Sequence, residues 1–220
     1  MILKVITYFL PWSLRRRALE RWFGFKIHSS ARIGIAWVFP RKLVMEANTK
    51  IDHFTVVINL DYIEMNVNST IGRNNWITGF PTNTQSRHFQ HQRDRQAELR
   101  LGESVDINKN HHLDCTNRIE IGRFTTIAGY NSQFLTHSID LIENRQDSAP
   151  IIIGEYAFVG TNVVILGGSI LPSRSILGAK SLLNKPHTKE WMLYGGIPAK
   201  ALQEIAQDAK FFNRTEGFVY

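Results

Sequence analysis

Several features are scarce in this sequence of 220 residues, and each scarcity excludes something. Cys115 is the only cysteine, so the chain can form neither an internal disulfide nor a cysteine zinc cluster. That usage suits a reducing compartment such as the cytoplasm. No stretch approaches the roughly 20 apolar residues that a membrane-spanning helix requires. Acidic residues number 19 against 26 basic ones, and the resulting formal charge of +7 favours anionic partners.

The N-terminal segment combines an apolar run with a cluster of arginines. The run from Val5 to Leu14 is interrupted by Pro11 and followed by Arg15, Arg16 and Arg17, which reverses the order of a secretory signal. We expect a helical extension over residues 1–26. One interpretation is a helix lying on an anionic membrane surface; the other is a helix packed against the main domain. The apolar side chains concerned are Trp12, Leu14, Leu19, Trp22 and Phe23.

A repeat of six residues runs from Ile153 to Leu183. In five consecutive hexads the first position is always Ile, Val or Leu, and the fifth is always Ala, Val or Ser. This spacing is neither helical nor simple strand periodicity, and it predicts a chain that turns a corner after each short strand. Three such strands close a triangular coil, whose interior is buried only by stacking on neighbouring coils. Fainter hexads begin at Ile33, Ile71, Leu101 and Ile121.

The repeats predict one solenoid domain over residues 27–197. Residues 198–220 are expected to form a C-terminal helix and tail, with the helix between Pro198 and Phe212. Two stretches interrupt the repeat, one near residues 81–98 and the other at 136–150. Insertions in a solenoid project as loops, often on the binding face, so both are candidate parts of a site.

The stretch from Ile153 to Lys200 resembles the hexapeptide-repeat acetyltransferases, which include galactoside, maltose and capsular or O-antigen sugar O-acetyltransferases. The similar motifs are Ile153–Gly160, Gly178–Ser181 and Gly195–Lys200. The resemblance implies an all-β fold, a left-handed parallel β-helix with short N-terminal and C-terminal helical extensions. It also implies a homotrimer with active sites between subunits, and acetyl-CoA as co-substrate with no metal ion. Lys180 and His187 depart from the family pattern near the nucleotide site.

The resemblance identifies His137 as the catalytic residue. The family's catalytic histidine lies on a loop that leaves the repeat after an Ile-Ala pair, and here Ile127-Ala128 leads to His137. The chemistry suits this residue type, because a hydroxyl is a poor nucleophile near neutral pH. An imidazole with a pKa near ~6.5 can take its proton as general base.

Residues shortly before His137 are candidates for binding the acceptor. Asn108 matches a family asparagine that helps to hold the acceptor, and His112 and Asp114 follow closely. Three roles stay open for Asp114: binding acceptor hydroxyls, orienting a histidine, or lying exposed in a turn. His111 or His112 is an alternative base.

Six residues match positions where the family meets CoA. Phe158 corresponds to an aromatic position that can pack on the pantetheine arm, although it could instead fill a turn. Thr161 and Ala179 match positions beside that arm. Asn184, Lys185 and Lys200 lie near the open end of the coil, where lysines suit phosphate as point charges or are merely solvated.

The insertion near 81–98 is basic and lacks an aromatic platform. It could reach an anionic acceptor or be simply solvated; its charged residues are Arg87, His88, His91, Arg93 and Arg95. Without alternating aromatic residues it is a poor site for single-stranded nucleic acid, so no nucleic-acid partner is predicted.

The sequence therefore predicts O-acetyl transfer from acetyl-CoA to a sugar hydroxyl, in surface polysaccharide biosynthesis. The acceptor would be a saccharide or a nucleotide- or lipid-linked sugar, and the enzyme cytoplasmic, with a possible peripheral contact at the inner face of the membrane. N-acylation of an amino-sugar nucleotide and acetylation of serine are alternatives within the class. From other classes, a zinc carbonic anhydrase using His111, His112 and His137, or a non-catalytic scaffold, remains open.

Overall fold

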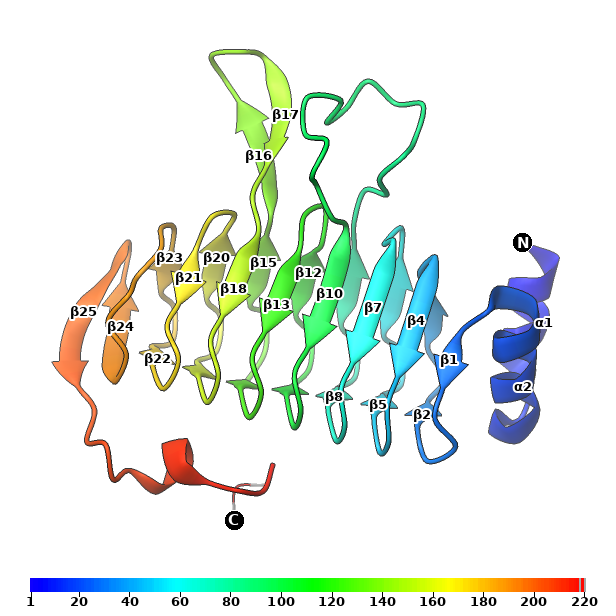
Figure 1. Cartoon of the computed structure of the whole chain (residues 1–220), viewed down its shortest axis with the longest axis horizontal. Helices are drawn as coiled ribbons and strands as arrows, with labels where there is room; N and C mark the ends of the chain where they lie inside the picture. Colours follow the sequence, from blue (N-terminus) through cyan, green and yellow to red (C-terminus); the bar gives the residue numbers. More distant parts are fainter. Residues whose placement is uncertain (218, 220) are drawn as a thin grey trace.

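The chain folds into a three-sided parallel β-helix with helices at one end (Figure 1). The computed structural model describes residues 1–217 and 219. Successive strands along the chain join successive sides, which we call sheets A, B and C. Sheets A and C have seven strands each and sheet B has nine.

The strands are short and pair in register with the coil above and below. Sheet A consists of β1 (Lys26–Ile27), β4 (Lys42–Met45), β7 (Tyr62–Met65), β10 (Glu98–Leu101), β13 (Ile119–Ile121), β18 (Ile151–Ile153) and β21 (Ile170–Leu171). Sheet B consists of β2 (Arg32–Ile33), β5 (Lys50–Ile51), β8 (Thr70–Ile71), β11 (Asp106–Ile107), β14 (Thr126–Ile127), β19 (Phe158–Val159), β22 (Ile176–Leu177), β24 (Met192–Gly196) and β25 (Ala199–Glu204). Sheet C consists of β3 (Trp37–Phe39), β6 (Val56–Ile58), β9 (Trp76–Thr78), β12 (His112–Asp114), β15 (Gln133–Leu135), β20 (Val164–Leu166) and β23 (Leu182–Leu183).

The interior is built as the hexads predict. The first position of each hexad is buried along the axis, as at Val159, Ile165, Leu171, Leu177 and Leu183. The small fifth positions are buried too, where the chain turns each corner. Each fully buried branched side chain contributes about 1.5–3 kcal/mol. Because this core is one continuous column, the coils stabilise one another along the whole stack.

Glycine is required where stacked corners touch. A Cβ on Gly122 would lie 2.6 Å from the backbone nitrogen of Glu155 in the next coil, which no side chain tolerates. Gly122, Gly154 and Gly160, each at the second position of a hexad, thus set how closely their coils approach.

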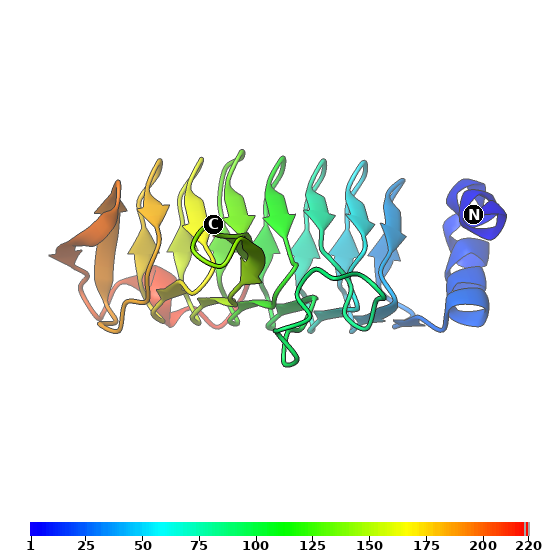
Figure 2. The same cartoon turned by 90° about the horizontal axis from the view of Figure 1, so that it is seen from above.

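Two helices close the N-terminal end: α1 (Ile2–Phe9) and α2 (Trp12–Phe23) (Figures 1 and 2). Leu19 of α2 is fully buried against the first coil, and the Phe23 ring packs 5.3 Å from that of Phe39. The interpretation of a helix packed on the main domain therefore describes α2, although Leu14 and Trp22 remain exposed. Among the described residues, no helix has both the length and the apolar content needed to cross a membrane.

The predicted helix between Pro198 and Phe212 is wrong. Ala199–Glu204 forms strand β25, antiparallel to β24, and only a 3-10 turn, η1 (Lys210–Asn213), follows. β24 pairs with β22 on one side and would otherwise present an unpaired edge to solvent. Pairing with β25 satisfies those backbone groups, so tertiary context overrides helix propensity.

Two insertions leave the corner where the chain passes from sheet C to sheet A, which we call the C–A corner. The first, residues 79–97, is irregular and links β9 to β10. The second contains an antiparallel hairpin of β16 (His137–Asp140) and β17 (Arg145–Ser148), so the predicted loop at 136–150 is largely strand. Both project from the same edge of the stack (Figure 1).

Candidate active site

A histidine–carboxylate pair lies at the C–A corner, between the two insertions. Asp114 ends β12, and its register partner Leu135 ends β15, two residues before His137. The chain thus brings His137 Nδ1 to 2.5 Å from Asp114 Oδ2. Because an ionised carboxylate only accepts hydrogen bonds, Nδ1 carries the proton, which leaves Nε2 as the basic nitrogen.

Asp114 is buried and surrounded by donors. Its Oδ2 also accepts a bond from the His137 backbone N–H at 3.2 Å, while its Oδ1 accepts bonds from the Thr116 N–H and hydroxyl at 3.1 and 2.7 Å. Burial raises the pKa of Asp114, but the hydrogen bonds from His137 and Thr116 outweigh it and lower that pKa overall. The hydrogen bond to Asp114 raises the pKa of His137, against the opposing effect of burial. Of the three roles open for Asp114, the geometry is that of a carboxylate orienting a histidine.

The pair opens on a pocket of about 310 Å³. Aromatic side chains of the first insertion form one wall, and the Phe89 ring stands edge-on to the His137 imidazole at 6.3 Å. The lining residues are Thr78, Gly79, Phe80, His88, Phe89, Asp114, Thr116, His137 and Gln146. A mixed aromatic and polar lining of this size suits a small polar molecule.

Arg95 holds the first insertion against the coil. Its guanidinium lies 4.6 Å from the Phe89 ring centroid and donates to the carbonyls of Phe80 and Thr116. Arg95 is therefore buried and structural, not directed at an acceptor. Among the other charged residues predicted here, His88 lines the pocket, and His91 Nε2 lies 3.7 Å from Asp147.

A chain of hydrogen bonds joins the two insertions behind the pocket. Gln92 Nε2 donates to the Asp147 carboxylate at 2.7 Å and to the Ser148 carbonyl at 2.8 Å. The Ser148 hydroxyl donates back to Gln92 Oε1 at 2.6 Å and accepts from Asn117. The backbone N–H of Asn117 donates to Thr136 Oγ1. The Thr136 hydroxyl in turn donates to the Asp114 backbone carbonyl at 2.8 Å. We call this chain, from Gln92 to Asp114, the clamp.

The remaining acceptor candidates lie apart from the pocket. His112 is exposed at the start of β12, on the same outer face of sheet C as Asp114. Asn108 lies at the B–C corner, where the chain passes from sheet B to sheet C. With its amide nitrogen toward Asp106, it donates to that carboxylate at 3.0 Å and accepts from the Gly129 N–H at 3.1 Å. His111 is buried, and burial lowers its pKa to about 4.

The donor candidates divide into groups. Thr161 and Ala179 lie on the B–C corner with Asn108, and the Thr161 hydroxyl bonds the backbone of Tyr130. Asn184 and Lys185 follow β23 and therefore lie on the C–A corner, the side of His137. Lys200 is exposed in β25, opposite Gly195. The structure therefore places two of the six donor candidates, Thr161 and Ala179, on one corner with the acceptor candidate Asn108, and the other four elsewhere.

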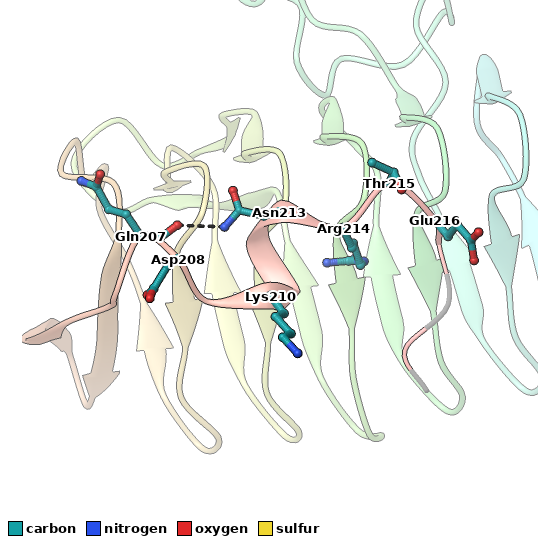
Figure 3. A pocket seen from close by; sticks show the side chains of 7 residues that line it. All are labelled: Gln207, Asp208, Lys210, Asn213, Arg214, Thr215 and Glu216. Carbon is teal, nitrogen blue, oxygen red and sulfur yellow. Dashed lines mark hydrogen bonds between the residues drawn. The ribbon is translucent and has the colours of Figure 1, made fainter.

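Phe158 contacts the C-terminal tail of its own chain. After β25 the chain turns back along the stack (Figure 3). The Phe211 ring of this tail stands edge-on to Phe158 at 5.7 Å. The tail encloses a hollow of about 550 Å³ whose lining includes Gln207, Lys210 and Arg214. None of those lining residues comes from the insertions, so this hollow is separate from the His137 pocket.

Sequence reasoning missed several residues of this site, among them Phe80, Phe89, Gln92, Thr116 and Gln146. Only Thr116 has a local signal, because an Asp side chain commonly accepts a hydrogen bond from the backbone N–H two residues on, as Asp114 does here. Across the described residues, no group of three or more His, Cys, Asp or Glu side chains is placed to hold a metal ion.

Comparisons with known proteins identify similar proteins, although no family model matches the chain. It is 24% identical over 127 residues to WbbJ of Escherichia coli K12, which is named for O-acetyl transfer in lipopolysaccharide biosynthesis. That alignment covers 52% of this chain and 64% of the relative, less than two thirds of its length.

Solved structures share the fold. The polySia-specific acetyltransferase NeuO superposes with a TM-score of 0.59 at 19% identity, over 84% of this chain and 78% of its own. The hexapeptide-repeat acetyltransferase VCA0836 of Vibrio cholerae, complexed with acetyl-CoA, gives 0.51 at 21% identity, over 93% and 84%. The predicted resemblance is confirmed at the level of the fold: the chain has the left-handed parallel β-helix of the hexapeptide-repeat acetyltransferases.

Proposed function

We propose that this protein is an O-acetyltransferase that moves the acetyl group of acetyl-CoA to a sugar hydroxyl, in the synthesis of a surface polysaccharide. The observation that carries the proposal is the His137–Asp114 pair at the mouth of a pocket. The names of the relatives support the reaction class, and the acetyl-CoA complex of the V. cholerae protein supports the donor.

His137 acts as general base. Its Nε2 takes the proton of the acceptor hydroxyl while the hydroxyl oxygen attacks the thioester carbonyl carbon. When the carbon–sulfur bond breaks, the imidazolium returns the proton to the departing sulfur, so free CoA thiol and the acetyl ester form together. Such assistance is typically worth about 10²–10⁴ in rate.

Asp114 positions the base. Its carboxylate keeps the proton on Nδ1, fixes the ring orientation, and stabilises the imidazolium that forms during the reaction. Thr116 bonds the carboxylate, and Thr136, at the end of the clamp, donates to the backbone carbonyl of Asp114. The dyad therefore enters the reaction already oriented.

The substrates would meet across sheet C. Asn108, Thr161 and Ala179 share the B–C corner, and β12 runs from that corner to its last residue, Asp114, a strand of three residues that spans about 10 Å. We place the pantetheine arm along that corner, with Asn108 and His112 toward the acceptor. Asn184, Lys185 and Lys200 would meet the nucleotide phosphates. The packing of Phe158 on the pantetheine arm stays a prediction. In the structure, the ring that contacts Phe158 is that of Phe211.

A homotrimer would complete such a site. The outer face of sheet C is open beside the dyad, with Trp76 about half exposed next to His112. A neighbouring subunit on this face would supply the second wall of a donor cleft and exclude water from the thioester. We place the enzyme in the cytoplasm, where it would meet a saccharide or a nucleotide- or lipid-linked sugar at the inner face of the membrane.

The proposal is tested by following the release of CoA thiol from acetyl-CoA. The acceptors offered would be neutral and acidic oligosaccharides, an amino-sugar nucleotide and serine, each with wild type, His137→Ala and His112→Ala. We expect transfer to a sugar hydroxyl and a decrease in kcat of about 10²–10⁴ for His137→Ala. For His112→Ala we expect a kcat near that of wild type and a higher KM for the acceptor. Undiminished transfer by His137→Ala would remove the assigned base, and transfer only to an amine or serine would change the acceptor class.

A further inference from the structure

Helix α1 exposes its apolar side. Its apolar residues Ile2, Val5, Ile6 and Phe9 recur at intervals of three and four positions, so they share one face of the helix. In a globular domain such a face normally packs on the core. Here all four are exposed, with Ile2 at 76% and Phe9 at 78% of full accessibility.

The polar side of α1 faces the protein instead. Thr7 is buried, and the Tyr8 ring lies 5.9 Å from Trp37. The Arg15 guanidinium of α2 lies 5.6 Å from the same tyrosine ring and donates to the Gly34 and Ala36 carbonyls of the first coil. These contacts set the rotation of α1 about its own axis, so the outward direction of the apolar face is a built feature.

The surrounding charge is strongly one-sided. Residues 1–45 hold nine lysines and arginines against one acidic residue, Glu20, whereas residues 46–220 hold 17 basic and 18 acidic residues. The whole positive excess of the chain thus belongs to this end. On α2, Arg17 and Arg21 share an exposed face with Leu14, and the structure describes no ion pair for either arginine.

We propose that this end of the β-helix is a docking surface for an anionic membrane, with Ile2, Val5, Ile6 and Phe9 inserted among the lipids. The basic side chains of α2 would lie at the level of the acidic headgroups. An amphipathic helix binds membranes through buried apolar area and attraction to anionic lipids, and both components are present. The alternative occupant, a second copy of the same end, would bring two concentrations of positive charge together.

The helix that contacts the membrane in this proposal differs from the one that the sequence indicated. The sequence pointed to α2 and its aromatic residues as the membrane-facing element, but α2 packs on the first coil and α1 presents the apolar face. The surface does not depend on acetyl transfer. Its experiment therefore fails or succeeds independently of the His137 assays.

The test is co-sedimentation of the full chain with vesicles of phosphatidylcholine, with and without phosphatidylglycerol. We expect wild type to bind the phosphatidylglycerol vesicles and to be released by salt. Ile6→Asp and Phe9→Asp should each lower the partition coefficient at least tenfold. The matched control is Leu202→Asp, which makes the same charge change at an exposed apolar residue in β25, far along the chain, and should bind as wild type does.

Thermal melts establish that the variants are folded, and light scattering measures their oligomeric state. The proposal is overturned if wild type does not bind phosphatidylglycerol vesicles, or if Phe9→Asp and Leu202→Asp bind equally. It is also overturned if Phe9→Asp binds as wild type but dissociates an oligomer, because the face would then be an interface between copies.

Discussion

Replacement of Asp114 by asparagine changes one oxygen of the dyad to an amide nitrogen and keeps the side chain's size. Every polar neighbour described for the Asp114 carboxylate is a donor: His137 Nδ1, the His137 N–H and the Thr136 hydroxyl on Oδ2, and the Thr116 N–H and hydroxyl on Oδ1. An amide offers only one acceptor oxygen. In Asp114→Asn, the donors on one of the two oxygens must therefore face an NH₂ group, and where that group takes the Oδ2 position the bond to His137 Nδ1 is lost.

The size of the effect follows from that bond. A hydrogen bond to a charged group contributes about 1.5–3 kcal/mol, and each ~1.36 kcal/mol of barrier is tenfold in rate. We expect kcat to fall about 10- to 100-fold, with the KM for acetyl-CoA unchanged. The bond also raises the pKa of His137, so its loss lowers that pKa. Because the base works as neutral imidazole, the rising acid limb of the kcat–pH profile should move to lower pH in the variant.

The assay is CoA thiol release measured across pH for wild type, Asp114→Asn and a control. Asp140→Asn is the matched control, because Asp140 lies on the same hairpin and caps its turn without touching His137. The reasoning is refuted if Asp114→Asn keeps kcat within about threefold of wild type and shows the same acid limb, since a purely structural carboxylate would leave that limb in place.

Three further predictions follow from the clamp, the corners and the exposed lysine. Gln92→Leu removes the hydrogen bonds that join the insertions, each worth about 0.5–1.5 kcal/mol. We therefore expect kcat to fall several-fold and amide hydrogen exchange in residues 137–148 to become faster. Unchanged exchange would show that the hairpin is stable without the bonds from Gln92. Gly122→Ala should cost about 1–3 kcal/mol of stability, whereas Gly178→Ala, whose Cβ would lie 3.4 Å from its nearest neighbour, should leave the melting temperature nearly unchanged; equal melting temperatures would contradict the role given to the close corners. Lys200→Ala should raise the KM for acetyl-CoA about fivefold at constant kcat, the size of a ~1 kcal/mol exposed charge interaction; an unchanged KM would make Lys200 a solvated lysine.

The parts of the fold that were predictable are those encoded locally. A branched side chain at Ile165 or Leu171 and a small one at Ser169 are needed by the coil itself, so the period of six carries the architecture. The breaks in the period located both insertions. The place of His137 at the start of the second insertion was predictable because the motif that precedes its loop is also local, whereas its role as base stays a prediction. Its interaction with Asp114 remained one of three options, because spacing along the chain does not reveal which residues meet across neighbouring strands.

The parts that were not predictable depend on contacts between distant segments. Gln92 reaches Ser148 across 56 residues, and no periodicity records that approach. The strand β25 exists because β24 offers an edge, a condition absent from its own sequence. The face of α1 follows from its spacing, but the direction of that face depends on Tyr8 and Arg15 packing on the first coil.

Because both insertions leave the same corner, the spacing between strands sets the distance between them. The first leaves at the end of β9 and the second at the end of β15, with only β12 between them, so their roots are two strand spacings apart, about 10 Å. A coil added or removed between them would change that separation in a single step of about 4.8 Å. The width available to a ligand between the insertions therefore changes by whole coils. Substitutions within a coil can make only smaller adjustments to that width.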